Sequence, residues 1–261
     1  MNTIPMVFHF AFFRGATNWS WRDFHTLCLK SCFVRAGAEK IVVHYDRDGE
    51  GDAWTEAKAL PNIEWRQTML DWKIHGKPIK DQRIMADYHR LQTLHAEGGF
   101  FCDLDFIFLK SFEKLRGYPA IIGTQCRQKK KLCCGLMGSI AGSTFIKAYL
   151  DEYEKWDPSE EKKVWTFANI VPWRLSETHA VCVLPRVVFY PVAWSNKTFW
   201  AGRPHSLKSS HAVHLWETLH PELSVEVLMK TCLAPEIESM GADQSKSTGI
   251  ISLRDGLLSF D

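Results

Sequence analysis

The sequence predicts an α/β fold in which a central, mostly parallel sheet is flanked by helices. Short runs of β-branched and aromatic residues alternate with segments whose apolar residues recur every three or four positions. The order strand, helix, strand, helix, strand fills the chain as far as Arg66, and this order is typical of a parallel sheet covered by helices.

The first half of the chain supplies most of the expected sheet. Its elements are, in order, strand Ile4–Phe13, helix Trp21–Ala36, strand Lys40–Tyr45, helix Ala53–Leu60 and strand Asn62–Arg66. Gly37 is expected to end the first helix, because glycine readily adopts the left-handed conformation found after helices. A long helix then lies within Ile79–Gly99, and its two final glycines lead directly into an apolar strand, Gly98–Leu109.

The second half is less regular but shows no linker or repeat. We expect strands within Tyr118–Gln125 and Cys133–Gly142, a helix over Ser143–Trp156, extended segments at Val181–Pro185 and Val187–Trp194, and a helix within Pro221–Cys232. Residues 234–261 are rich in small polar residues and are expected to form a mobile or surface-wrapping tail. The whole chain, 1–261, therefore predicts a single domain.

Composition limits the classes of function. The chain has 261 residues, 46% of them hydrophobic, and a net charge of +2, so it predicts a real core and no nucleic-acid partner. The apolar N-terminus lacks a basic region and a cleavage pattern, and no apolar run is long enough to span a membrane. We therefore expect a cytoplasmic protein with free thiols. The basic loop Arg127–Lys131 leaves peripheral contact with an anionic membrane open.

Two carboxylates stand out in the stretch "GGFFCDLDFIFL", Gly98–Leu109. In a strand, Asp103 and Asp105 would point to the same side, because side chains alternate with a period of two. Two neighbouring carboxylates in an apolar strand repel each other and lose hydration, so they need a cation or a raised pKa. Hard oxygen ligands favour Mn²⁺ or Mg²⁺. The alternative is a solvated pair at the sheet edge, which the apolar flanks on both sides disfavour.

Three segments of the sequence together resemble a known enzyme family. They are "IPMVFHF", "ADYHRLQTLHAEGGFFCDLDFIFLKSF" and "HAVHLW". They resemble glycosyltransferases of the GT-A fold that carry a DXD motif, in the group of initiating mannosyltransferases, α-1,4-galactosyltransferases and capsular or toxin glucosyltransferases. The resemblance is carried by Ile4, Pro5 and His9, by Asp87 and Arg90, and by Gly98, Gly99, Asp103 and Asp105.

The resemblance implies a Rossmann-like sheet and roles for individual residues. It implies that Asp105 ligates Mn²⁺ or Mg²⁺, that Asp103 holds the ribose and helps to bind the metal, and that Asp87 and Arg90 contact the donor sugar. His214, with His211 as second choice, and Trp216 correspond to an element near the diphosphate, and His214 is expected to join Asp103 and Asp105 as a metal ligand. The catalytic set is thus Asp105, Asp103 and Arg90. Gly98, Gly99 and the aromatic residues Phe10 or Phe12 complete the expected donor site.

The expected function is transfer of a hexose from a UDP- or GDP-sugar to a hydroxyl of a glycan or glycoconjugate, with the retaining stereochemistry that the resemblance implies. Residues 1–115 would bind the nucleotide sugar, 116–233 would form the acceptor side, and 234–261 the tail. Two alternatives stay open. One is a metal-dependent phosphoryl hydrolase that recruits Asp46, Asp48 or Asp52 to a second metal. The other is an inactive module that binds sugar nucleotides.

Overall fold

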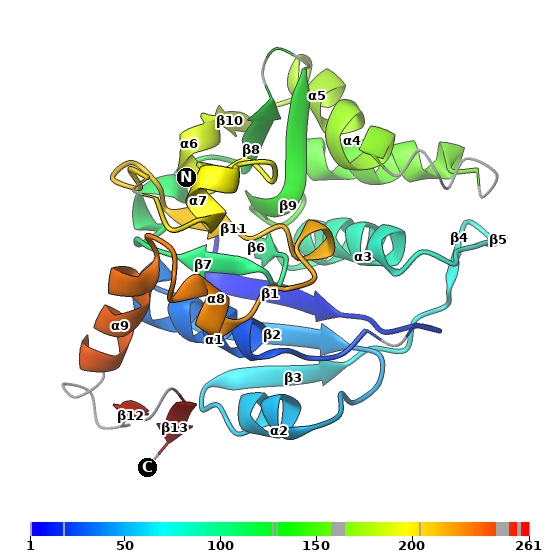
Figure 1. Ribbon diagram of the computed structural model, residues 1–261. Coiled ribbons are helices and arrows are strands. Elements are labelled where there is room, and N and C mark those ends of the chain that lie inside the picture. The colour runs from blue at the N-terminus through cyan, green and yellow to red at the C-terminus, as the bar shows by residue number, and fades with distance from the viewer. Residues whose placement is uncertain are drawn as a thin grey trace.

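We describe the fold from a computed structural model of the chain (Figure 1). The described residues are 2–17, 19–126, 128, 130–157, 165–203, 205–243, 251–254 and 257–260. Among them no helix is both long enough and apolar enough to cross a membrane. All eight cysteines are free thiols, as expected from the sequence.

The central sheet has seven strands in the order β10-β8-β9-β6-β1-β2-β3. These strands are β1 (Val7–Phe12), β2 (Lys40–Tyr45), β3 (Ile63–Gln67), β6 (Gly99–Cys102), β8 (Ala120–Cys126), β9 (Lys131–Ser139) and β10 (Cys182–Leu184). β6, β1, β2 and β3 are parallel to one another, whereas β9 runs antiparallel to both β6 and β8. The sheet is therefore mixed and mostly parallel, as the sequence predicts.

Helices cover both faces of this sheet (Figure 1). The longer helices are α1 (Asp23–Ser31), α2 (Asp52–Lys58), α3 (Gln82–Ala96), α4 (Thr144–Glu152), α5 (Val171–Ser176) and α9 (Ala234–Asp243). The short ones are α6 (Arg186–Phe189), α7 (Lys197–Trp200), α8 (Val225–Leu228) and the turns η1 (Cys32–Ala36), η2 (Glu113–Leu115), η3 (Tyr153–Lys155), η5 (Thr166–Ile170) and η6 (Glu217–Leu219). One core cluster joins the sheet to α1 and α2, and a second joins it to α3, α4 and α5.

Three small antiparallel pairs complete the chain. They are β4 (Lys73–Ile74) with β5 (Lys77–Pro78), β7 (Phe106–Phe108) with β11 (Ala212–His214), and β12 (Ile251–Arg254) with β13 (Leu257–Phe260). The β7–β11 pair lies close to the central sheet and positions the candidate site.

The expected strand Gly98–Leu109 is wrong as a single element. β6 ends at Cys102, and Asp103, Leu104 and Asp105 form the connection to β7. The strand breaks here because β6 pairs with β1 and β9 in the main sheet, whereas β7 pairs with β11. The two carboxylates therefore leave the carboxyl end of a parallel strand, which is where ligands bind in open α/β sheets.

Two further expectations fail locally. Residues 187–189, expected to be extended, belong to helix α6, which begins directly after Pro185. Residues 234–243, expected to be part of a tail, form helix α9, whose Ile237 and Met240 pack into a third core cluster with α1 and β7. Apolar residues spaced three apart could have revealed this helix.

The Gly98–Gly99 pair is required by the entry into β6. The two glycines have φ of +73° and +96°, values that residues with a Cβ rarely adopt. A Cβ on Gly99 would also lie 2.5 Å from the carbonyl oxygen of Val7 on β1. Glycine here lets β6 pair closely with the first strand.

Candidate active site

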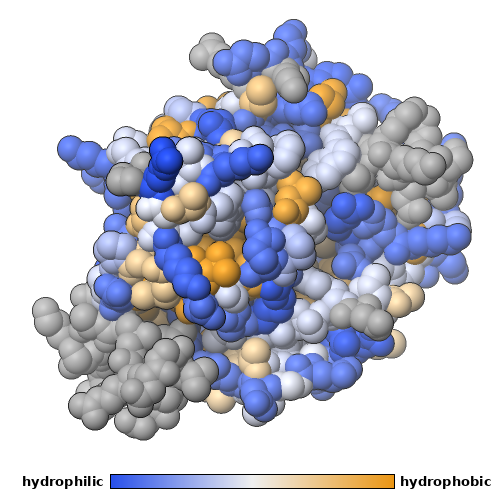
Figure 2. Space-filling view, in the orientation of Figure 1, coloured by the Kyte–Doolittle hydropathy of each residue, from blue (hydrophilic) through white to orange (hydrophobic). Residues whose placement is uncertain are grey.

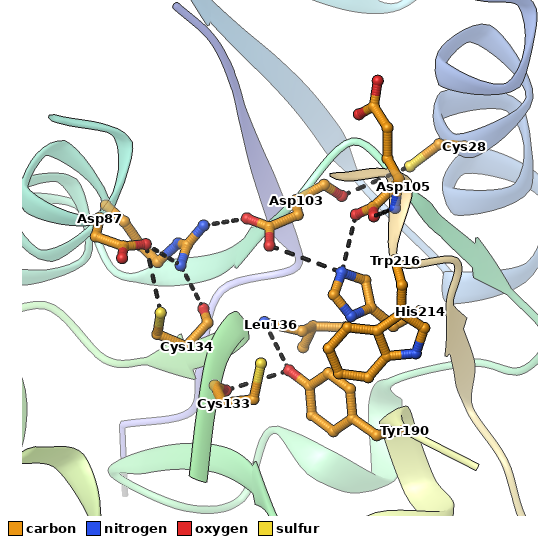
Figure 3. Close-up of polar contacts among 12 residues, drawn as sticks. Cys28, Asp87, Asp103, Asp105, Cys133, Cys134, Leu136, Tyr190, His214 and Trp216 are labelled. Atoms are coloured by element: carbon orange, nitrogen blue, oxygen red, sulfur yellow. Dashed lines mark hydrogen bonds and ion pairs between the residues drawn. The ribbon is translucent and has the colours of Figure 1, made fainter. Parts of the chain in front are cut away.

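The pairing of β7 with β11 brings a distant histidine to the two aspartates. His214 lies opposite Phe106 in this ladder, and the backbone N–H of Leu215 donates to the carbonyl of Asp105 at 2.8 Å. The His214 ring also stacks on the Phe106 ring, with 4.5 Å between the centroids. Register and stacking together fix the imidazole beside the carboxylates (Figure 3).

Asp103, Asp105 and His214 form a compact set of potential metal ligands. His214 Nε2 lies 3.0 Å from Asp105 Oδ1 and 3.9 Å from Asp103 Oδ2. One ligand atom from each residue falls within 4.8 Å of the others, and this is the one such group among the described residues. Asp105 and His214 are buried, whereas the Asp103 side chain is 38% exposed and faces the cavity. Two carboxylate oxygens and one imidazole nitrogen suit a divalent cation, and the open side leaves room for further ligands.

The electrostatics of the three groups differ. Asp103 is partly exposed, but its carboxyl loses hydration in the cavity wall, and this loss is the largest reason that its pKa rises to about 6, although Arg90 opposes the rise. Burial also disfavours the charged form of Asp105, but His214 and the backbone N–H of Glu217 hold its pKa below the ordinary value. Asp105 in turn outweighs burial at His214 and raises the imidazole pKa. The negative charge of Asp105 is thus offset by a proton that His214 holds more tightly, and the repulsion between the two carboxylates is reduced because Asp103 is more easily protonated. A bound cation would offset the same negative charge.

Arg90 connects the expected sugar-binding residue to the metal group. Its guanidinium donates to Asp87 Oδ1 at 2.8 Å, to the carbonyl of Cys134 at 2.6 Å and to Asp103 Oδ1. Arg90 is 2% exposed, so these acceptors are essential to its burial. The sequence predicts the pair of Asp87 with Arg90 at i, i+3, but the bond to Asp103 depends on how α3 packs beside β6.

A cavity of about 1560 Å³ opens beside these residues. Its wall contains the predicted residues Asp87, Arg90, Asp103, Asp105, His214 and Trp216. Trp216 has a left-handed φ of +59°, unusual for a residue with a side chain, and its indole N–H donates to the carbonyl of Val192. The structure therefore brings six of the expected site residues to one cavity.

Glu217 is a cavity residue that the sequence analysis missed. Its backbone N–H donates to Asp105 Oδ2 at 2.8 Å, and its carboxylate accepts from the indole of Trp19 at 3.0 Å. The same carboxylate lies 3.1 Å from His25 Nε2. The acidic side chain directly after His214–Trp216 is the signal that could have revealed it.

Close backbone approach also shapes the site. A Cβ on Gly135 of β9 would lie 2.7 Å from Asp103 Oδ2, and the backbone N–H of Asp103 donates to the Gly135 carbonyl. Tyr190 supports the same strand, because its hydroxyl donates to the carbonyl of Cys133 and accepts from the N–H of Leu136. None of these contacts is visible in the local sequence pattern.

Four expected donor-site residues lie elsewhere. Phe10 and Phe12 are fully buried in the first core cluster, so neither can flank a base in the cavity, and this expectation is wrong. Ala11 of β1 and Phe13, the residue directly after β1, line the cavity instead, because side chains alternate between opposite sides along an extended chain. Gly98 and Gly99 are buried at the start of β6 and serve the backbone, not the cavity wall.

His211, the second choice for the histidine, is also placed away from the metal group. Its Nδ1 lies 3.0 Å from the carbonyl of Ser111.

The basic loop was expected at Arg127–Lys131, but Arg127 and Lys129 lie outside the described residues.

Known proteins that are similar to this chain include glycosyltransferases. A family profile described as "Glycosyltransferase sugar-binding region containing DXD motif" matches residues 30–122. Glucan organizing enzyme 1 of Cryptococcus neoformans var. grubii is 27% identical over 209 residues, covering 74% of this chain and 56% of that protein. Human lactosylceramide 4-alpha-galactosyltransferase is 24% identical over 172 residues, covering 58% of this chain and 46% of that protein. The chain thus spans about half the length of these two relatives.

The chain is also similar to two solved glycosyltransferase structures. The galactosyltransferase LgtC in complex with donor and acceptor sugar analogs has a TM-score of 0.49 and 14% identity, covering 91% of this chain and 95% of that one. The PaToxG glycosyltransferase has a TM-score of 0.48 and 18% identity, covering 67% of this chain and 70% of that one. The family profile covers the segment that carries Asp87, Arg90, Asp103 and Asp105, so the chain is similar to DXD-containing glycosyltransferases in the part that holds the candidate site.

Proposed function

We propose that this chain transfers a hexose from a UDP- or GDP-sugar to a hydroxyl of a glycan or glycoconjugate, with a bound Mn²⁺ or Mg²⁺. The convergence of Asp103, Asp105 and His214 on one side of a large cavity carries the proposal. Asp103 and Asp105 are close to each other and to His214, and His214 Nδ1 has no hydrogen-bond partner among the described residues. This donor set fits a divalent cation.

A bound cation would supply stabilisation of the negative charge that develops on the leaving diphosphate. The protein's own residues would hold the reactants. Arg90 fixes Asp103 and Asp87 together, so that the Asp87 carboxylate can accept hydrogen bonds from hydroxyls of the donor sugar. Trp216 and Glu217 line the cavity, and the backbone N–H of Glu217 holds the Asp105 carboxylate in place. Retention of the anomeric configuration is proposed on the family resemblance.

The phosphoryl hydrolase is the less favoured candidate. Asp46 Oδ1 and Oδ2 accept hydrogen bonds from the backbone N–H groups of Arg14 and Gly15, both at 2.9 Å. Its carboxylate is thus engaged by the loop after β1, and it does not belong to the metal-ligand group of Asp103 and Asp105. No observation on the described residues supplies a second metal position.

Incubation with Mn²⁺ and a panel of sugar nucleotides tests the proposal. We expect release of free sugar and nucleoside diphosphate from one donor, and loss of this reaction in Asp105→Asn and in EDTA. Asp151→Asn is the matched control, since Asp151 is a half-exposed carboxylate on α4. Inorganic phosphate as product would favour the hydrolase, and donor binding without reaction would favour the inactive module. Full activity of Asp105→Asn or in EDTA would exclude a metal-dependent site.

A further inference from the structure

The outer part of the cavity has an unusual number of exposed apolar side chains. Trp165, Val183, Trp194 and Leu219 are 51%, 37%, 53% and 45% exposed, and all four line the cavity. Single exposed apolar residues are normal on a protein surface, but a group of them in one cavity indicates a binding surface. On the face drawn in Figure 2, hydrophobic side chains gather near the middle and hydrophilic ones surround them.

The cavity is larger than one ligand needs. Pockets for a single small molecule hold roughly 300–1,000 Å³, whereas this cavity measures about 1560 Å³. A donor held at Asp87 and Asp103 would occupy the part of the cavity beside α3 and β6. The apolar side chains come from other segments: Trp165 precedes η5, Val183 belongs to β10, Trp194 lies between α6 and α7, and Leu219 ends η6. A second ligand could therefore contact these apolar side chains while the donor contacts Asp87 and Asp103.

The chemistry of this wall is mixed. Polar side chains stand among the apolar ones in the cavity wall: Gln125, Gln128, Lys131, Ser176, Arg186 and Thr218. A lipid chain would leave these donors and acceptors without partners, at a cost in free energy. A pyranose ring offers both apolar C–H faces, which stack on indole rings, and hydroxyl edges, which bond to amides, hydroxyls and cations.

We propose that Trp165 and Trp194 form an acceptor subsite for an oligosaccharide of at least two rings. This inference rests on the proposed function, since it assigns the acceptor of the same cavity. The two indoles come from separate segments of the chain, before η5 and after α6, and both line the cavity, so each offers an aromatic face on which one sugar ring can stack. The hydroxyl that receives the hexose would then face Asp103 and Trp216.

Trp165→Ala and Trp194→Ala test the subsite, because both side chains are half-exposed and their truncation leaves the core intact. Phe33→Ala is the matched control, since Phe33 is 48% exposed and lies outside the cavity wall. We expect the KM for a trisaccharide acceptor to rise about tenfold in each tryptophan variant. Donor hydrolysis without acceptor should stay unchanged in all three variants.

The acceptor series separates the outcomes. A KM that falls from a monosaccharide to a disaccharide to a trisaccharide acceptor supports stacking of successive sugar rings. A KM that falls only when the alkyl chain of a monosaccharide glycoside is lengthened overturns the assignment in favour of a lipid acceptor. Tryptophan variants that behave like Phe33→Ala also overturn it. Binding of the same trisaccharide by saturation-transfer NMR tests the subsite without turnover, and signals unchanged in both variants count against it. Absence of metal-dependent donor hydrolysis in the unmodified chain would instead refute the proposed function.

Discussion

Arg90 and Asp103 form an ion pair that joins helix α3 to the end of strand β6. The guanidinium is almost fully buried and also bonds to Asp87, so one cation serves two carboxylates of the cavity wall. This arrangement links the packing of α3 on the carboxyl end of β6 to the geometry of the proposed metal group, because Asp103 belongs to both.

Arg90→Met should therefore destabilise the protein. The substitution leaves the largely buried Asp87 and the partly exposed Asp103 without their cation, and removing one partner of a buried ion pair costs up to about 3–5 kcal/mol. Urea unfolding measures the change. Arg83→Met is the control, because Arg83 forms an ion pair with Asp81 on the same helix but is half-exposed. Its loss should cost less than about 1 kcal/mol, and equal losses in the two variants would contradict the role given to Arg90.

His214→Gln should weaken Mn²⁺ binding by at least about tenfold, since it removes one of three proposed ligands and its hydrogen bond to Asp105. Calorimetry or the electron spin resonance of free Mn²⁺ measures the affinity without any donor. His211→Gln, three residues earlier, should bind Mn²⁺ as the unmodified chain does, because His211 contacts Ser111 instead. Equal affinities of all three proteins would remove His214 from the metal group.

The sequence predicts the elements that depend on local pattern. The predicted strand Lys40–Tyr45 is confirmed as β2, because a β-branched run bounded by turn residues is typical of a strand. The Asp87–Arg90 pair follows from helical spacing in the same way. The contacts of His214 with Asp105 could not be derived from the pattern, because they depend on the register between β7 and β11, strands that lie far apart in the sequence. The bond from Arg90 to Asp103 depends likewise on packing between elements.

Acid should destabilise the fold through a group of three histidines, of which His9 and His44 are buried and His89 is half-buried. His9 Nδ1 lies 3.2 Å from His44 Nε2, and the His89 ring packs against His44. Burial lowers the pKa of His9 and His89 to about 4 and that of His44 to about 2. The nearby charges of Glu64, Arg66 and Glu97 are paired with one another.

Because the pKa of each ring is lower in the folded state, the free energy of unfolding should decrease as the pH falls. The folded state keeps the three rings neutral, whereas the unfolded chain protonates them near pH 6.5, so stability is full above this pH and falls as the pH drops toward 4. Each ring contributes a slope of about 1.4 kcal/mol per pH unit over this window. Urea unfolding at pH 7, 6 and 5 measures the slope. His44→Asn should reduce it by about one third, and an unchanged slope would exclude the histidine group as its source.

Gly135→Ala should impair the site while the fold persists. The backbone of Gly135 does not have a positive φ, so alanine fits the strand, but its Cβ would lie 2.7 Å from Asp103 Oδ2. The carboxylate is the flexible partner and must turn away from His214. We expect Mn²⁺ affinity and donor hydrolysis to fall about tenfold, since positioning errors of this size are costly. Gly117→Ala, where an added Cβ meets no atom within 4 Å, is the control for stability and activity. If Gly135→Ala binds Mn²⁺ as tightly as Gly117→Ala, then the orientation of Asp103 is not what holds the metal.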